Sequence, residues 1–143
     1  MSTKRPVPEA LTIYTWGYST NRTFEDLLAA LPEDRRESGR VAIIDVRRSR
    51  RSRNPQWHCP HYSHWEHYSW LMYLGNAEGA ARGTWQPALG PKRMQEHLDY
   101  ATSLLRRYGA VVLICAERDP RRCHRVQVAE ALAARTGAEI VHL

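Results

Sequence analysis

The residues best suited to covalent or acid–base chemistry lie close together near the C-terminal end of the chain. Cys115, Glu117, Cys123 and His124 fall within one short segment. A thiolate is a nucleophile, an imidazole is a base or an orienting group, and a carboxylate transfers protons or binds a ribose hydroxyl. Asp45 supplies a second carboxylate at the end of an apolar run. We therefore predict these five residues as catalytic.

A second feature is a run of five arginines among the seven residues 47–53. Arginine makes bidentate contacts with phosphate, so this density predicts an anionic ligand such as a nucleotide or nucleic acid. A solvated basic loop would give the same pattern. The predicted anion-binding residues are Ser19, Asn21, Arg47, Arg51, Arg53 and Arg125.

Histidine recurs every third residue between positions 58 and 67, and Cys59 lies beside the first of them. Imidazole and thiolate are ligands for zinc or nickel, and Cys59 with His58 or His61 could close a site with Cys123 and His124. A step of three residues drifts by about 60° on a helix, so all four histidines cannot share one face. We assign no metal ligand and no cofactor from this pattern.

One further spacing, Cys115 followed six positions later by Arg121, occurs in cysteine-dependent phosphatases. Those enzymes wrap phosphate in a glycine-rich loop of backbone N–H groups. The segment between these two residues has no glycine and contains Pro120. The spacing is therefore a weak indication.

Apolar runs and helical periodicity predict the elements that position these residues. The strands are expected at residues 11–16, 41–46, 70–74, 111–114 and 139–143. The helices are expected at 23–31, 91–108 and 122–136, with loops at 33–40 and 75–90 and a long loop or short helices at 47–69. This alternation predicts an α/β fold: a single domain over 11–143 with a mainly parallel, Rossmann-like sheet of about five strands flanked by helices. Residues 1–10 are expected to form a flexible arm.

The polar segments all follow predicted strands. Residues 17–21, 45–55 and 115–125 come after the first, second and fourth strands. Ligands of open α/β sheets bind outside the carboxyl ends of the strands. If these strands are adjacent and parallel, one crevice collects all three segments.

The composition is that of a soluble globular domain. The chain has 143 residues, of which 43% are hydrophobic and 25% charged, so one packed domain is expected and wholesale disorder is excluded. The formal net charge is +6, and a GC-rich genome would also enrich arginine. No apolar run approaches the roughly 18 residues of a membrane span, and no apolar segment follows the basic N-terminus. We expect no membrane partner and a cytoplasmic location.

The sequence resembles the DUF488 family, small bacterial and archaeal proteins named for their unknown function. The resemblance runs from Ile13 to Leu143. Its parts are residues 14–23, Asp45-Val46-Arg47, residues 52–57, Leu74-Gly75-Asn76, Cys115-Ala116-Glu117, Cys123-His124-Arg125 and Val141-His142-Leu143. Tyr18 stands where the family usually has histidine, so no role of that histidine is carried over. The resemblance implies an α/β domain with a polar site built from the Asp-Val-Arg, Cys-Ala-Glu and Cys-His-Arg segments, and it supplies no reaction.

Three functions fit these patterns. The favoured one is an enzyme that acts on a nucleotide or nucleic acid through a Cys/Glu/His/Arg site at the strand ends. The alternative is a non-catalytic nucleic-acid-binding module that uses the arginines of 47–53 and the nearby aromatic residues. A second alternative is a metal- or redox-responsive accessory protein. The sequence defines neither the substrate nor the oligomeric state.

Overall fold

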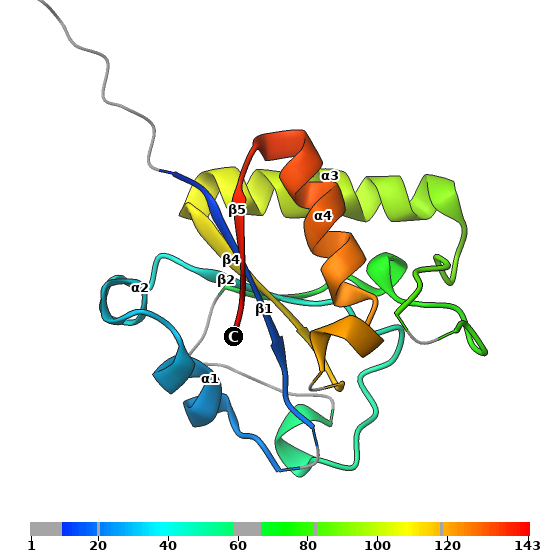
Figure 1. Cartoon of the computed structure of the whole chain (residues 1–143), viewed down its shortest axis with the longest axis horizontal. Coiled ribbons are helices and arrows are strands. Elements are labelled where there is room, and N and C mark those ends of the chain that lie inside the picture. The colour runs from blue at the N-terminus through cyan, green and yellow to red at the C-terminus, as the bar shows by residue number, and fades with distance from the viewer. Residues whose placement is uncertain (1–9, 20, 59–66, 82, 118) are drawn as a thin grey trace, which may run out of the picture.

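The computed structural model describes residues 10–19, 21–58, 67–81, 83–117 and 119–143. Its five strands form one parallel sheet in the order β3-β2-β4-β1-β5 (Figure 1). The strands are β1 (Thr12–Gly17), β2 (Ala42–Asp45), β3 (Tyr68–Trp70), β4 (Ala110–Cys115) and β5 (Glu139–His142). The predicted α/β fold with about five parallel strands is confirmed.

Four α-helices and three short 3₁₀ helices connect the strands. They are α1 (Phe24–Ala30), α2 (Glu33–Ser38), η1 (Pro55–Trp57), η2 (Met72–Leu74), α3 (Pro91–Tyr108), η3 (Pro120–Arg122) and α4 (Arg125–Thr136). Thr23 begins α1 with a capping box, in which its side chain accepts from the Asp26 N–H and the Asp26 side chain accepts from the Thr23 N–H. In the described part of the chain, none of the helices combines the length and apolar character needed to cross a membrane.

The core has two layers, one on each face of the sheet. Alternate strand residues point to opposite faces because the side-chain period of a strand is two. The layer under α3 and α4 includes Ile13, Ile44, Leu113, Leu98, Leu105, Val128 and Leu132. The layer under α1 includes Trp16, Ile43, Ile114, Phe24 and Leu27. Figure 1 shows α1 and α2 on the opposite side of the sheet from α3 and α4.

Three element predictions were wrong in detail. Residues 33–38 form α2 instead of a loop; this helix buries no residue, so apolar periodicity could not reveal it. Its ends are set by acidic residues in the first turn and by Gly39 in the left-handed conformation (φ 64°). The third strand lies at 68–70, and the apolar residues after it form η2. Helix α4 begins at Arg125 because η3 and an extended Cys123 precede it.

The connections after β1 and β4 leave the sheet on opposite faces. β1 is followed by α1, whose apolar residues pack in one layer, and β4 is followed by α4, which packs in the other. The two strands are neighbours, paired in register from Thr12 with Ala110 to Gly17 with Cys115. Their carboxyl ends are therefore a topological switch point, where open α/β sheets bind ligands.

Candidate functional site

A pocket of about 420 Å³ lies at this switch point. Its walls come from the segments that follow β1, β2 and β4. The lining residues are Tyr18, Ser19, Arg51, Ser52, Arg53, Asn54, Ala116 and Glu117. The three polar segments that were expected to converge thus supply one pocket. It contains cationic, hydroxyl, amide and carboxylate groups.

Backbone hydrogen bonds continue the β1–β4 ladder into the wall of the pocket. The Tyr18 N–H donates to the Cys115 carbonyl at 3.1 Å, and the Ser19 N–H donates to the Ala116 carbonyl at 2.8 Å. Ser19 has φ 55° and is the one described residue other than glycine with a positive φ. This left-handed conformation turns the chain directly beside the pocket, and serine adopts it at a modest energetic cost.

The opposite wall is held by contacts to the backbone of Arg22. The Arg22 carbonyl accepts from the Asn54 amide at 2.7 Å and from the Trp57 indole at 2.9 Å. The Ser52 N–H donates to Nδ1 of His58 at 3.1 Å. These contacts fix the segment that carries Arg51 and Arg53, and both of these arginines have exposed side chains.

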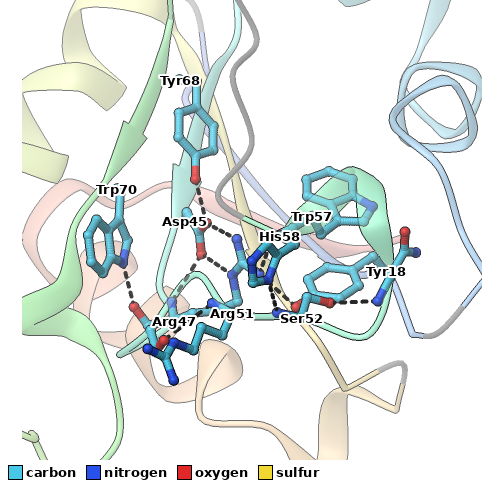
Figure 2. Close-up of polar contacts among 11 residues, drawn as sticks. Tyr18, Asp45, Arg47, Arg51, Ser52, Trp57, His58, Tyr68 and Trp70 are labelled. Atoms are coloured by element: carbon cyan, nitrogen blue, oxygen red, sulfur yellow. Dashed lines mark hydrogen bonds and ion pairs between the residues drawn. The ribbon is translucent and has the colours of Figure 1, made fainter.

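Asp45 and Arg47 form a buried ion pair next to the pocket (Figure 2). Nε of Arg47 donates to Oδ1 of Asp45 at 2.8 Å, and Nη2 donates to Oδ2 at 2.5 Å. The remaining guanidinium nitrogen, Nη1, donates to the Tyr18 hydroxyl and to the Trp57 carbonyl. The Tyr68 hydroxyl donates to Oδ2 of Asp45 at 2.5 Å. The network joins β2, β3 and two loops.

The network alters the ionisation of its members. Burial is the main cause that raises the pKa of Tyr68, and the charge of Asp45 raises it further. Burial also raises the pKa of Tyr18, although its contacts with Ser52 and Arg47 oppose the shift. The pKa of Arg47 is raised because its hydrogen bonds and charge attraction to Asp45 outweigh burial. Both phenols therefore remain neutral at physiological pH, and Arg47 remains charged.

Two thiols and an imidazole lie together between the end of β4 and the start of α4. We call Cys115, Cys123 and His124 the thiol cluster. Sγ of each cysteine and one ring nitrogen of His124 all lie within 4.8 Å of one another. Both cysteines are free thiols; Cys123 and His124 are buried, and Cys115 is partly buried. Cys115 belongs to the layer under α3 and α4. The cluster therefore lies beside the pocket and is not part of its lining.

Hydrogen bonds define the orientation of His124. Its Nε2 lies 2.9 Å from the carbonyl oxygen of Val46, and its Nδ1 lies 3.9 Å from Sγ of Cys123. Because a carbonyl can only accept, Nε2 carries the proton in the neutral ring, and the lone pair on Nδ1 faces the sulfur.

The two thiols shift each other's ionisation in opposite directions. The hydrogen bond between them lowers the pKa of Cys123 and raises that of Cys115. When the His124 ring is protonated, its Nδ1–H faces the sulfur, and this charge and hydrogen bond lower the pKa of Cys123 further, as does the backbone N–H of Arg125. Arg125 is fully buried, and its Nη1 donates to the Glu117 carbonyl. Of the two thiols, Cys123 is therefore the more acidic.

The structure sorts the predicted site residues into three groups. Ser19, Arg51, Arg53 and Glu117 line the pocket, Asp45 and Arg47 bind each other, and Cys115, Cys123 and His124 form the thiol cluster next to Arg125. Asn21 is exposed and is not among the residues that line the pocket. Sequence reasoning did not identify the pocket residues Ser52 and Asn54. The resemblance of residues 52–57 to a known family was the feature that could have indicated them.

The binding-module alternative requires exposed aromatic rings on which bases can stack, and the described rings near the arginine run are buried or already in contact with other side chains. Trp57 is fully buried and stacks on Tyr18, with ring centroids 5.1 Å apart. Tyr68 is held by Asp45, and the Arg50 guanidinium lies over the Trp70 ring. Two more aromatic residues near this run, at positions 62 and 65, lie outside the described residues.

The histidine pattern is mostly outside the described residues, since Cys59, His61 and His64 are not among them. His58 is exposed and accepts from the Ser52 N–H, while the ring of His67 packs against Tyr108.

Arg121, the arginine of the phosphatase-like spacing, is exposed and pairs with Asp119, with 3.3 Å between Nε and Oδ1. The guanidinium of Arg121 thus pairs with a carboxylate two residues away in the same segment.

Comparison with known proteins gives one family match. A family model described as a domain of unknown function, DUF488, matches residues 27–132. No curated protein and no solved structure matches the chain.

Proposed function

We propose that this chain, which belongs to the DUF488 family, is an enzyme that acts on a nucleotide or on nucleic acid. One observation carries the proposal: the pocket at the carboxyl ends of β1 and β4 combines two exposed arginines with a carboxylate. A phosphate group and a reacting hydroxyl require these two kinds of group. The switch point of a parallel sheet is also where nucleotide ligands bind in other α/β folds.

Arg51 and Arg53 are the phosphate ligands in this proposal. Both lie in the pocket wall with exposed side chains, and neither has an acidic partner within 4.0 Å among the described residues. Arg47, by contrast, has its guanidinium bound to Asp45, Tyr18 and Trp57. The free guanidinium groups make bidentate contacts with phosphate oxygens.

Glu117 is the proton-transfer group in this proposal. It lines the pocket, and its Oε1 accepts from the Asp119 N–H at 3.1 Å, which holds the carboxylate in place. A positioned carboxylate can take a proton from a substrate hydroxyl or from an attacking water molecule. Asp45 has no access to a ligand because it is fully buried, so the proposal gives it the role of positioning Arg47.

The binding half of the proposal is tested with nucleoside phosphates and short labelled RNA and DNA strands. We expect Arg51→Ala combined with Arg53→Ala to weaken binding by at least about tenfold, because a hydrogen bond to a charged group contributes about 1.5–3 kcal/mol. Arg36→Ala combined with Arg40→Ala is the matched control. It removes the same charge from exposed positions before the amino end of β2, whereas the pocket lies at the carboxyl ends of the strands. Equal weakening in both double variants would contradict a specific phosphate site.

A nucleic-acid-binding role without catalysis is the second candidate. It is favoured by Arg48, which is half-exposed outside the pocket lining and lies 4.0 Å from the exposed Glu78. Together with Arg51 and Arg53 it gives three exposed cations on one short segment. This candidate predicts that affinity for single strands falls steeply with salt, and that no substrate is converted.

A further inference from the structure

We propose that Cys115, Cys123 and His124 bind a zinc ion and leave one coordination position open. The proposal is separate from the proposed function, because these three residues are not among those that line the pocket. Two thiolates and one imidazole are a ligand set that zinc takes in proteins, and sites with three protein ligands keep a position for water or another ligand.

The spacing of the ligand atoms matches a tetrahedral ion. With Zn–S near 2.3 Å and Zn–N near 2.0 Å, neighbouring ligand atoms of a tetrahedron lie about 3.5–3.8 Å apart. Sγ of Cys123 and Nδ1 of His124 lie 3.9 Å apart, and all the ligand atoms lie within 4.8 Å of one another. The Cys123–His124 pair is thus about 0.4 Å wider than in a tetrahedral site, and the remaining pairs must approach by no more than about 1 Å to bind one ion.

His124 already has the orientation of a metal ligand. A histidine that binds a metal donates its other ring N–H to a carbonyl or carboxylate, which fixes the tautomer and the ring plane. Nε2 of His124 makes this contact with the Val46 carbonyl at 2.9 Å and leaves Nδ1 facing Cys123. The carbonyl belongs to the chain after β2, so it supports the site from a separate element.

The chain between the ligands is shaped to bring them together. Asp119 caps η3 through the Arg121 N–H, and Glu117 accepts from the Asp119 N–H. These turns return the chain so that Cys123, at the end of η3, reaches Cys115 at the end of β4.

The site would fix the loop that carries a pocket residue. Cys115 lies at one end of the loop, and Cys123 and His124 lie at the other, with Glu117 between them. Arg125 adds a contact from its Nη1 to the Glu117 carbonyl.

The test uses the full chain, purified without a histidine tag and stripped with chelator, and cobalt(II) as a spectroscopic substitute for zinc. We expect one equivalent of cobalt to give the intense near-ultraviolet charge-transfer absorption of thiolate ligands and the visible bands of a tetrahedral ion. Zinc should abolish both sets of bands by displacing cobalt. A titration that produces neither set would overturn the proposal.

Variants test the ligand set. Cys115→Ser and Cys123→Ser should each lose at least about half of the charge-transfer intensity, because each removes one of the two thiolates, whereas Cys59→Ser, which removes the third cysteine of the chain, should keep all of it. Circular dichroism identifies any variant that fails to fold, and His124→Gln, which keeps a polar side chain, then provides an independent loss of the visible bands. Full intensity in folded Cys115→Ser or Cys123→Ser, or loss in folded Cys59→Ser, contradicts the assignment.

Cyanide tests the open position in the cobalt form. We expect the visible bands to shift when cyanide replaces water, with the charge-transfer band retained. Unchanged bands would mean a closed site and would overturn that part of the proposal.

Discussion

Asp45 and Arg47, two residues apart at the end of β2, bind each other through two parallel hydrogen bonds of 2.8 and 2.5 Å inside the protein. The sequence suggested a catalytic carboxylate and an anion-binding arginine at these positions. In the structure their charges are directed toward one another and toward Tyr18 and Tyr68. The pair connects β2, β3 and the pocket wall through these contacts, so we expect loss of the pair to change the position of the pocket wall.

Removing the negative partner leaves a buried cation without compensation. We expect Asp45→Asn to lower the free energy of unfolding by about 3–5 kcal/mol, the range for breaking a buried ion pair from one side. Urea unfolding followed by tryptophan fluorescence measures this. Glu130→Gln, which removes an exposed carboxylate from the interior of α4, is the control and should leave the midpoint nearly unchanged. Equal midpoints for the two variants would show that the pair contributes nothing.

Tyr68 should be silent in an alkaline titration of the folded protein. Because burial and Asp45 raise its pKa, tyrosinate absorbance between about pH 9 and 11 should be the same in Tyr68→Phe as in the natural protein.

The same shift sets the direction of the pH dependence of stability. Since the folded pKa of Tyr68 exceeds the unfolded value of about 10, its contribution is present below that pH and is lost as pH rises toward the folded pKa. A free energy of unfolding that increases above pH 10 would contradict this assignment.

The first turn of α1 depends on the side chain of Thr23, whose hydroxyl accepts from the Asp26 N–H at 3.1 Å. We expect Thr23→Ala to destabilise the protein by about 1 kcal/mol, the typical loss for an N-cap. Thr23→Ser keeps the hydroxyl and should remain close to the natural protein. Thermal unfolding compares the three, and a serine variant as unstable as the alanine variant would rule out the cap as the cause.

A variant of Glu117 distinguishes the two proposed functions, an enzyme and a non-catalytic nucleic-acid-binding module. We expect Glu117→Gln to reduce turnover by about 10²–10⁴-fold, the range for losing a general base, while binding of nucleoside phosphates changes little because the arginines remain. Chromatographic analysis of products from nucleotides and short strands gives the turnover. If the natural protein converts none of these substrates but binds strands with a steep salt dependence, the binding module is the better description.

The sequence predicted those elements whose apolar residues face the core. Helix α3 matched from Pro91 to the stop at Gly109, where φ is 83°, because its buried residues recur at helical spacing. Helix α2 buries nothing, so only its charges and Gly39 indicated it. The strand order could not be predicted, because it depends on β4 pairing with both β1 and β2 across long stretches of chain.

For the site, the convergence at the strand ends was predictable because strand polarity fixes it. The distribution of residues within the site was not. Asp45 and Cys115 end neighbouring strands, yet Asp45 turns toward Arg47 and Cys115 toward the start of α4. Which side chain faces solvent and which faces a partner depends on pairs of side chains that only the folded chain defines.

The central place of β4 also constrains how the protein is made. β1 and β2 do not pair with each other; both pair with β4, whose residues are synthesised about 65 positions after those of β2. In a nascent chain that ends before residue 110, the edges of β1 and β2 that β4 later covers are unpaired. The central part of the sheet, and the pocket at its end, can therefore form only late in synthesis, when β4 pairs with both β2 and β1. We expect long-range strand pairing to limit the folding rate.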